Sequence, residues 1–278
     1  MDDVFQLRDY LYEKTGLYLP DGRRYLFEGQ FLKCMEALGI SSISKYFSYL
    51  KSSEGQKSAL GQLINEIAGN ETSFFGDQTR FRALEDIFLP DLVFTKEKLG
   101  IKKIRIWSAG CSSGEEAYAI AMVLDSLKDS LLKDWDIKIW ATDINSPILE
   151  RAKLGHYEDY SLQGIPSNFK ASYLKSNGSG VEITQALKQY VDFEYFNLNG
   201  NGQDSKIVSE IDIIYCSNVL IRFDLAIRQK IIQNFYDALN ERGYFLLGYY
   251  ESLHGLKNGF RHVHFTGGMC YRKITNGE

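Results

Sequence analysis

Short β-rich runs alternate with helical stretches over the last two thirds of the chain, and this alternation restricts the possible folds more than any other feature. The first two runs are IRIW (104–107) and IKIWATD (137–143), and a helical pattern follows each. Strands joined by helices form parallel sheets with helices on both faces. We therefore predict a parallel, doubly wound α/β sheet with an antiparallel C-terminal edge. The other predicted strands cover 190–196, 211–218 and 243–250, and the edge hairpin covers about 260–274.

The first 90 or so residues lack such runs and carry apolar residues at helical spacing. Val4, Leu7 and Leu11 begin the first stripe, and a fifth stripe stops at Pro90. A length of 278 residues allows two domains at roughly 150 residues each. The sequence thus predicts an all-α domain over 1–90 and the sheet domain over 91–278.

One segment of the sheet domain interrupts the alternation. Residues 155–190 contain Gly164, Pro166 and the run SNGSG (176–180), which are typical of turns. We predict that this segment is an insertion that folds as a small antiparallel subdomain.

Charge and composition exclude several classes of protein. The net charge of −4 and the pI near 5.7 disfavour a nucleic-acid partner, because binding to phosphates depends on an excess of Lys and Arg. No apolar run approaches the ~20 residues of a membrane span, and the acidic N-terminus does not resemble a signal peptide. We expect a cytoplasmic protein without membrane insertion or a metal site. Its unpaired, reduced thiols would be Cys34, Cys111, Cys216 and Cys270.

A glycine-containing loop follows the first predicted strand and points to a cofactor. The loop reads WSAGCSSGEE (107–116), without the GxGxxG of dinucleotide-binding dehydrogenases. Glu115 at the helix start is stabilised by the helix dipole, but it would also repel a pyrophosphate and attract a cation. Asp143 ends the second strand, where a carboxylate can accept from ribose hydroxyls. Together these residues indicate S-adenosylmethionine (SAM).

Asn218 ends the fourth predicted strand, and two interpretations of it stay open. An Asn at this place can cap the helix that follows. Its amide can instead contact the methionine part of the cofactor or the substrate.

Several segments in a fixed order resemble the CheR-type chemotaxis receptor methyltransferases. They span almost the whole chain, and members of that family methylate glutamate side chains on receptor signalling helices with SAM. The resemblance implies a Rossmann-like SAM methyltransferase sheet with a helical N-terminal domain and a small β-subdomain insertion. The segments are NETSFFGDQTRF (70–81), IRIWSAGCSSGEEAYAIAMVL (104–124), ATDINSPILERAKLGHY (141–157), YVDFEYFNL (190–198), IIYCSNVLIRFD (213–224) and GYFLLGYYESL (243–253).

The resemblance also implies a set of cofactor contacts, and the chain departs from the family near them. Gly76 stands where the family motif has an Arg, and Arg222 stands where it has a Tyr. Ser217 replaces the Arg of the family's CRN. Arg222 is our candidate catalytic residue, because it could compensate for the missing Arg. The alternative is that Arg222 points to solvent beside Asp224. The implied contacts are Asn70, Thr72, Ala109, Glu115, Asp143, Asn197, Leu198, Asn218 and Val219.

The expected partner is a protein substrate, and chemoreceptor cytoplasmic helices are the candidate. Family members carry a basic N-terminal helix that grips acidic receptor helices. The corresponding helix here, LFEGQFLKCMEALG (26–39), has Lys33 as its one basic residue. Three hypotheses remain: a receptor methyltransferase, a methyltransferase with another protein substrate, or a module that binds SAM or S-adenosylhomocysteine (SAH) without catalysis.

Overall fold

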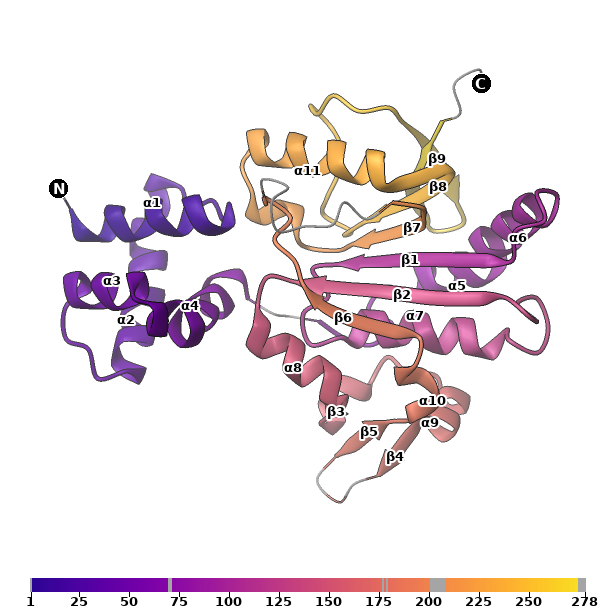
Figure 1. Cartoon of the computed structure of the whole chain (residues 1–278), viewed down its shortest axis with the longest axis horizontal. Coiled ribbons are helices and arrows are strands. Elements are labelled where there is room, and N and C mark those ends of the chain that lie inside the picture. The colour runs from indigo at the N-terminus through magenta and orange to yellow at the C-terminus, as the bar shows by residue number, and fades with distance from the viewer. Residues whose placement is uncertain (1, 70–71, 177, 179, 201–208, 275–278) are drawn as a thin grey trace.

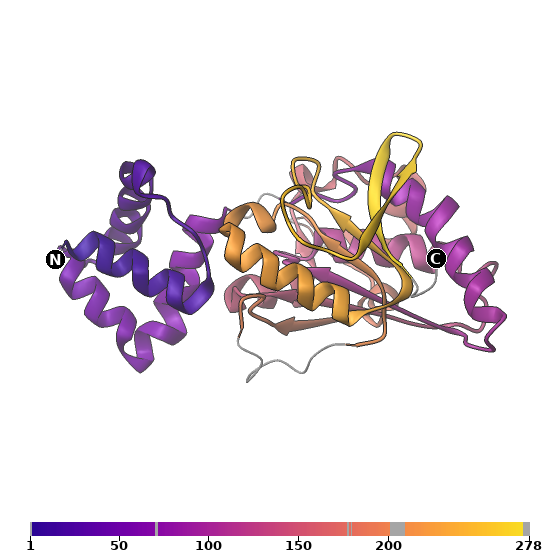
Figure 2. The same cartoon turned by 90° about the horizontal axis from the view of Figure 1, so that it is seen from above.

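Helices α1 to α4 form a bundle that stands beside the rest of the chain (Figures 1 and 2). The computed structural model describes residues 2–69, 72–176, 178, 180–200 and 209–274. The bundle forms because apolar residues at helical spacing, such as Leu7 and Leu11 of α1, are fully buried on one face. The four helices are α1 (Asp3–Thr15), α2 (Arg24–Ala37), α3 (Ile43–Lys51) and α4 (Ser53–Ala68), and a 3-10 turn (Asp21–Arg23) precedes α2.

The sheet domain contains a seven-stranded sheet in the order β6-β2-β1-β7-β8-β10-β9. The first five of these strands pair in parallel, and β10 pairs antiparallel with both β8 and β9. The predicted parallel sheet with an antiparallel C-terminal edge is confirmed. The strands are β1 (Lys103–Ala109), β2 (Asp136–Asp143), β6 (Val191–Tyr195), β7 (Ile211–Cys216), β8 (Leu239–Leu247), β9 (Phe260–Phe265) and β10 (Gly268–Lys273).

The two faces of the sheet are buried in two different apolar cores. Ile213 and Tyr215 of β7 belong to the core that contains α7, whereas Ile214 and Cys216 belong to the core that contains α11 and the N-terminal bundle. This alternation follows from the two-residue period of a strand. The helices of the sheet domain are α7 (Glu115–Ser126), α8 (Ser146–Leu154), α10 (Gln185–Lys188) and α11 (Leu225–Ala238), and η4 (Leu220–Arg222) is a 3-10 turn.

The 155–190 segment forms a separate three-stranded antiparallel sheet, which confirms the predicted subdomain. Its strands are β3 (His156–Tyr157), β4 (Leu174–Ser176) and β5 (Val181–Ile183), in the order β3-β5-β4. The connection between β3 and β4 contains the 3-10 helix η3 (Asp159–Leu162) and α9 (Ser167–Tyr173).

The prediction that the fifth helix stops at Pro90 is wrong. Helix α5 (Gln78–Ala83) continues through a π-helical turn, η2 (Leu84–Phe88), into α6 (Leu89–Glu97), and Pro90 lies in the first turn of α6. Proline has no backbone N–H to donate to the helix. It is tolerated here because the preceding π turn changes the pattern of backbone hydrogen bonds at this point.

These helices pack on the sheet and not on the bundle. Phe81, Leu84 and Phe88 share the core of Ile104 and Ile106 of β1. We therefore propose that the boundary between the two domains lies near residue 69 and not near residue 90.

Backbone and side-chain hydrogen bonds join the bundle to the carboxyl ends of the strands. Tyr18 N donates to Arg222 O at 2.9 Å, and Tyr12 Oη donates to Asp224 Oδ2 at 2.6 Å. Asn197, which follows β6, donates through Nδ2 to the carbonyl of Lys14 at 2.9 Å. The bundle thus covers the edge of the sheet at which ligands bind in such folds.

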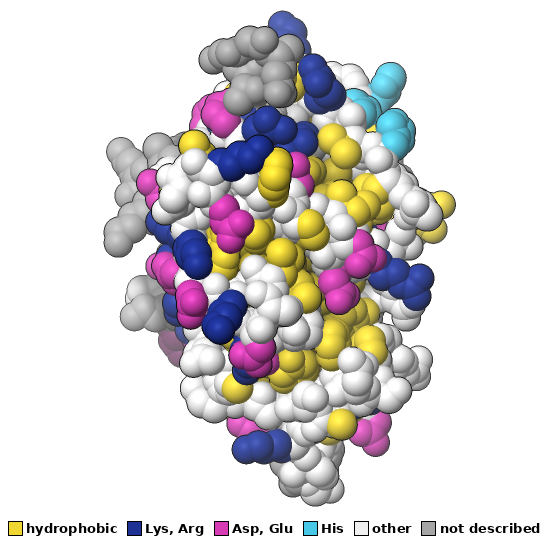
Figure 3. All heavy atoms as spheres, turned by 90° about the vertical axis from the view of Figure 1, so that its right-hand side faces the viewer, with side chains coloured by type: hydrophobic (Ala, Val, Ile, Leu, Met, Phe, Trp, Pro, Cys, Tyr) yellow, Lys and Arg dark blue, Asp and Glu magenta, His cyan; other side chains and the backbone are white. Residues whose placement is uncertain are grey.

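The opposite end of the sheet is shown in Figure 3, where charged side chains of both signs are interspersed with apolar ones. Within the described residues, no helix is long and apolar enough to cross a membrane. The four cysteines are free and buried, as expected, and burial raises the pKa of each thiol.

A buried ion pair ties α6 to the middle of the sheet. Asp212 on β7 is fully buried, and its Oδ2 accepts from Lys96 Nζ at 2.6 Å and from Arg105 N at 2.9 Å. Its Oδ1 accepts from Asn240 Nδ2 at 2.6 Å. Because Asp212→Ala leaves these donors without an acceptor, we expect it to lower the free energy of unfolding by about 3–5 kcal/mol in denaturant titrations.

Asp192→Ala is the matched control for this prediction. The Asp192 side chain is 65% exposed and meets Lys138 Nζ at 3.4 Å. An exposed pair of this kind contributes at most ~1 kcal/mol. Equal losses in the two variants would contradict a structural role for the buried pair.

Candidate functional site

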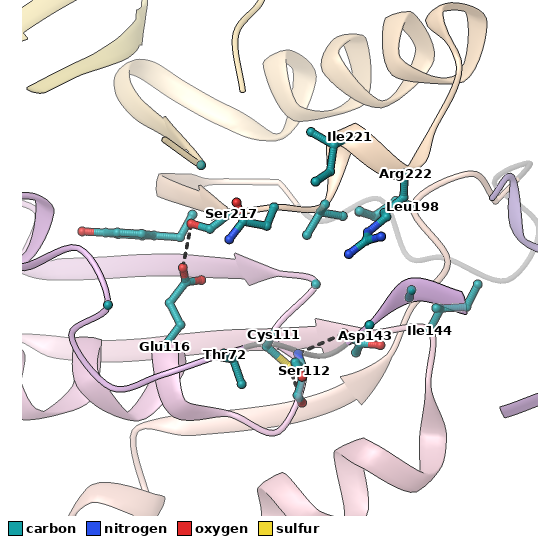
Figure 4. Close-up of a pocket in the computed structure, with 18 of the residues that line it drawn as sticks. Thr72, Cys111, Ser112, Glu116, Asp143, Ile144, Leu198, Ser217, Ile221 and Arg222 are labelled. Carbon is teal, nitrogen blue, oxygen red and sulfur yellow. Dashed lines mark hydrogen bonds between the residues drawn. The ribbon is translucent and has the colours of Figure 1, made fainter. Parts of the chain in front are cut away.

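A cavity of about 850 Å³ lies between the helical bundle and the carboxyl ends of β1, β2 and β7. Figure 4 shows that its walls come from segments far apart in the sequence. The structure therefore brings together most of the residues singled out from the sequence. Those that line the cavity are Thr72, Gly76, Asp143, Asn197, Leu198, Asn218, Val219 and Arg222.

The loop after β1 approaches the loop after β7 very closely. Gly110 has a φ of +78°, and a Cβ at this position would lie 2.4 Å from Val219 Cγ2. A side chain here would collide with its neighbour, so the glycine allows the two loops to form one continuous wall.

Asp143 links the end of β2 to the same loop. Its Oδ2 accepts from Ser112 N and its Oδ1 accepts from Asn145 N, both at 2.9 Å. Removal from bulk water raises the pKa of this carboxyl, and the backbone N–H groups oppose that rise. Among the described residues the Ser112 Oγ has no hydrogen-bond partner, and this oxygen is itself buried.

The structure separates the two acids at the start of α7. Glu115 is buried, accepts from Ser113 Oγ at 2.7 Å and does not line the cavity. Glu116 lines the cavity instead, and it accepts from Ser108 Oγ at 2.8 Å and from Ser217 Oγ at 2.9 Å. Burial raises the pKa of the Glu116 carboxyl, whereas the two serine hydroxyls and the charge of a nearby arginine lower it.

Of two other residues implied by the resemblance, the structure describes only Ala109, which does not line the cavity. Ala109 is buried in the core and its neighbour Gly110 lines the cavity in its place. Asn70 lies outside the described residues.

Asn218 does not cap a helix in this structure. The N-cap of α11 is Asp224, whose Oδ1 accepts from Ile227 N at 2.9 Å. Asn218 has a φ of +61°, a left-handed conformation that is uncommon for residues other than glycine.

Glu251 holds the Asn218 turn in place, and the sequence pattern gave no reason to single it out. Its Oε2 accepts from Asn218 N at 2.7 Å and from Gly248 N at 2.8 Å, and its Oε1 accepts from Ile221 N at 3.2 Å. The carboxylate is 9% exposed. Backbone donors from two chain segments thus converge on one buried anion.

Arg222 enters the cavity and does not pair with Asp224. Figure 4 shows its guanidinium on the side of Asp143 and Leu198, whereas Ser217 and Glu116 lie together at the other end. The expectation that Arg222 points to solvent beside Asp224 is therefore wrong.

Arg80, on α5, is a further residue that the sequence did not indicate. It lines the cavity near Ser217 and is 9% exposed. Only the fold shows this position, because a charged residue on an amphipathic helix is usually exposed to solvent. The described residues contain no group of three or more His, Cys, Asp or Glu that could hold a metal ion.

Comparisons with known proteins match the whole chain. The family model "CheR methyltransferase, all-alpha domain" matches residues 2–68, and "CheR methyltransferase, SAM binding domain" matches residues 70–269. A chemotaxis protein methyltransferase of Vibrio cholerae is 33% identical, with 99% of this chain and 94% of that protein covered. A chemotaxis protein methyltransferase of Borreliella burgdorferi is 32% identical, with 92% of this chain and 90% of that protein covered. One of Pseudomonas putida is 29% identical, with 97% of each chain covered.

We predict that Glu251→Gln weakens SAH binding about tenfold or more. The amide nitrogen of Gln cannot accept from the backbone donors, so the Asn218 turn loses part of its support. Calorimetry with SAH measures the change. Glu241→Gln is the control, because Glu241 is 52% exposed and lies 3.7 Å from Lys273 Nζ. SAH binding unchanged in the Glu251 variant would contradict the assigned role of the carboxylate.

Proposed function

Because the chain belongs to the CheR methyltransferase family and is a SAM-dependent methyltransferase, we propose that it methylates glutamate side chains on chemoreceptor cytoplasmic helices. One observation carries this proposal. The cavity at the strand ends combines the tight Gly110 loop with the Asp143 carboxylate. These groups fit a ligand with ribose hydroxyls and without phosphate.

The adenosine part of SAM would occupy the side of the cavity near β2 and β6. Asp143 would meet the ribose, because its carboxylate lines the cavity at the end of β2. Leu198 and Ile144 offer apolar surface beside them for the adenine. Asn218 and Val219 would line the side nearer β7.

When bound, SAM supplies a methyl carbon on a sulfonium: a glutamate oxygen forms the new bond to this carbon while the carbon–sulfur bond breaks and its electron pair stays on sulfur. A glutamate has a pKa near 4.3, so it is already an anion at neutral pH. The chain therefore needs no general base. Its residues position the two reactants and exclude water, and positioning of this kind can contribute ~7–11 kcal/mol.

A second hollow adjoins the cavity and suits a protein acceptor. It has a volume of about 810 Å³ and shares Ser73, Gly76, Asp77, Tyr249 and Tyr250 with the cavity. We call it the outer groove. Three tyrosines rim it with exposed fractions of 68, 82 and 86%, namely Tyr160, Tyr249 and Tyr250. Tyrosines offer large amphipathic contacts and are enriched in protein interfaces.

Transfer of labelled methyl groups from SAM to cognate receptor cytoplasmic fragments tests the proposal. The expected product is a glutamate methyl ester that releases methanol in base. Calorimetry with SAM and SAH accompanies this assay. Transfer to a different protein, with none to any cognate receptor, would overturn the proposed substrate.

The binding module without catalysis is the second candidate, because Gly76 and Arg222 replace the Arg and the Tyr of the family motifs. Tight binding of SAM and SAH without transfer to any acceptor would support it. Arg222→Ala separates the two candidates further. If the variant loses turnover while its SAH affinity stays unchanged, Arg222 acts on the acceptor in a working enzyme.

We predict that Tyr249→Ser/Tyr250→Ser raises the KM for the receptor fragment about tenfold and changes SAH affinity by less than about twofold. The two side chains are 82 and 86% exposed where the outer groove meets the cavity, so their loss removes far more contact area from a protein acceptor than from a ligand at the strand ends. Phe94→Ser on α6 is the control, since Phe94 is 62% exposed and lies away from the cavity. An unchanged KM in the double variant would show that the acceptor docks elsewhere.

A further inference from the structure

We infer that Arg80 and Glu116 form the binding site for the zwitterionic amino-acid end of SAM, with Arg80 binding its α-carboxylate and Glu116 its α-ammonium group. The inference rests on the use of SAM by this chain, and it does not depend on which protein accepts the methyl group. It assigns a role to Arg80, which neither composition nor spacing singled out, and it gives the cation-binding role to Glu116 of the two acids that begin α7.

Two nitrogens of the Arg80 guanidinium, Nε and Nη1, contact described side chains, whereas Nη2 does not. Its Nε lies 2.9 Å from Asp77 Oδ2, and its Nη1 donates to Ser217 Oγ at 3.1 Å. No described residue accepts from Nη2. A guanidinium has five N–H donors in a planar fork that matches a carboxylate. Arg80 is 9% exposed and lines the cavity, and no described residue supplies an acceptor for its remaining donors, so a ligand in the cavity can supply one.

Glu116 provides the opposite charge at the same end. Ser217 Oγ contacts both groups, because it accepts from Arg80 Nη1 and donates to Glu116 Oε2 at 2.9 Å. One hydroxyl therefore fixes the distance between a buried cation and a buried anion. An amino acid carries its ammonium and carboxylate on one carbon, so a paired acid and base is the complementary arrangement.

The order of the strands places this pair at the correct end of the cavity. Asp143 ends β2, and Ser217 directly follows β7, two strands away across β1. Neighbouring strands are about 4.8 Å apart, so the two positions are separated by roughly 10 Å. A ligand with its ribose at Asp143 can extend along the loop after β1 and present its amino-acid end at Ser217.

Position 76 cannot perform the same task without a rearrangement. A Cβ at Gly76 would lie 2.7 Å from Ser73 Oγ. Arg80 reaches the cavity from the first turn of α5, four residues later. At the Ser217 end of the cavity the basic side chain is therefore on the helix and not on the turn before it, whereas Arg222 lies at the Asp143 end.

Three ligands test the two roles separately by calorimetry. SAH carries both the carboxylate and the ammonium group, its decarboxylated analogue carries the ammonium group alone, and 5′-methylthioadenosine carries neither. We expect Arg80→Ala to weaken SAH binding about 10- to 100-fold and to leave binding of the other two ligands within about twofold. Glu116→Gln should weaken SAH and the decarboxylated analogue while it leaves 5′-methylthioadenosine unchanged.

The controls separate binding from folding. Arg82→Ala removes an exposed arginine from the same helix and should bind all three ligands like the wild type. Arg80→Lys keeps the charge without the planar fork and should give an intermediate SAH affinity, and it replaces the alanine variant if that variant does not fold.

Several results would overturn the inference. Equal weakening of all three ligands by Arg80→Ala would mean that Arg80 only supports the fold of the pocket. If Arg80→Ala keeps the wild-type preference for SAH over its decarboxylated analogue but raises the KM for the receptor fragment, Arg80 contacts the acceptor and not the cofactor. Absence of methyl transfer to receptors would contradict the proposed function alone, because these binding ratios need no acceptor.

Discussion

The bonds that the Glu251 carboxylate accepts from the backbone after β7 and β8 hold the functional end of this protein together. They fix Asn218 in a left-handed turn, and Val219 of that turn closes against Gly110. The same segment continues to Arg222, whose carbonyl accepts from Tyr18 of the bundle. Both the wall of the cavity and the docking of the helical domain therefore depend on one buried anion. Left-handed non-glycine residues cost about 1–3 kcal/mol, and they persist only where surrounding contacts hold them.

The charges of the site are arranged locally and not over the whole surface. Helix α2 carries two basic and two acidic residues, so it has no excess of positive charge. The buried Arg80, by contrast, stands beside Glu116 inside the cavity. Such groups act strongly because few water molecules screen them. The exposed tyrosines around the outer groove supply the contact surface that a protein acceptor needs at this end.

The sequence predicted the sheet from its local pattern, whereas the resemblance to the CheR family implied most of the residues of the cavity wall. The β-rich runs, the glycine loop and Asp143 are consecutive in the chain, and parallel topology brings the strand ends to one edge. One error came from a local rule that the rest of the structure overrides: Pro90 was expected to end a helix, but the helix continues through a π turn. For Asn218 the pattern left two interpretations open, and the structure excludes helix capping because Asp224 is the N-cap of α11.

By itself, the sequence determined the fold class, the family, the cofactor and the edge of the sheet where the site lies, since periodicity and motif spacing are properties of the chain. Only the tertiary structure decided that Glu116 and not Glu115 faces the cavity, that Arg222 turns inward, and that Arg80 supplies a buried charge. The reason is geometric. Successive side chains on a helix point in directions that differ by about 100°. Which of them faces the cavity depends on how the helix packs against the other elements.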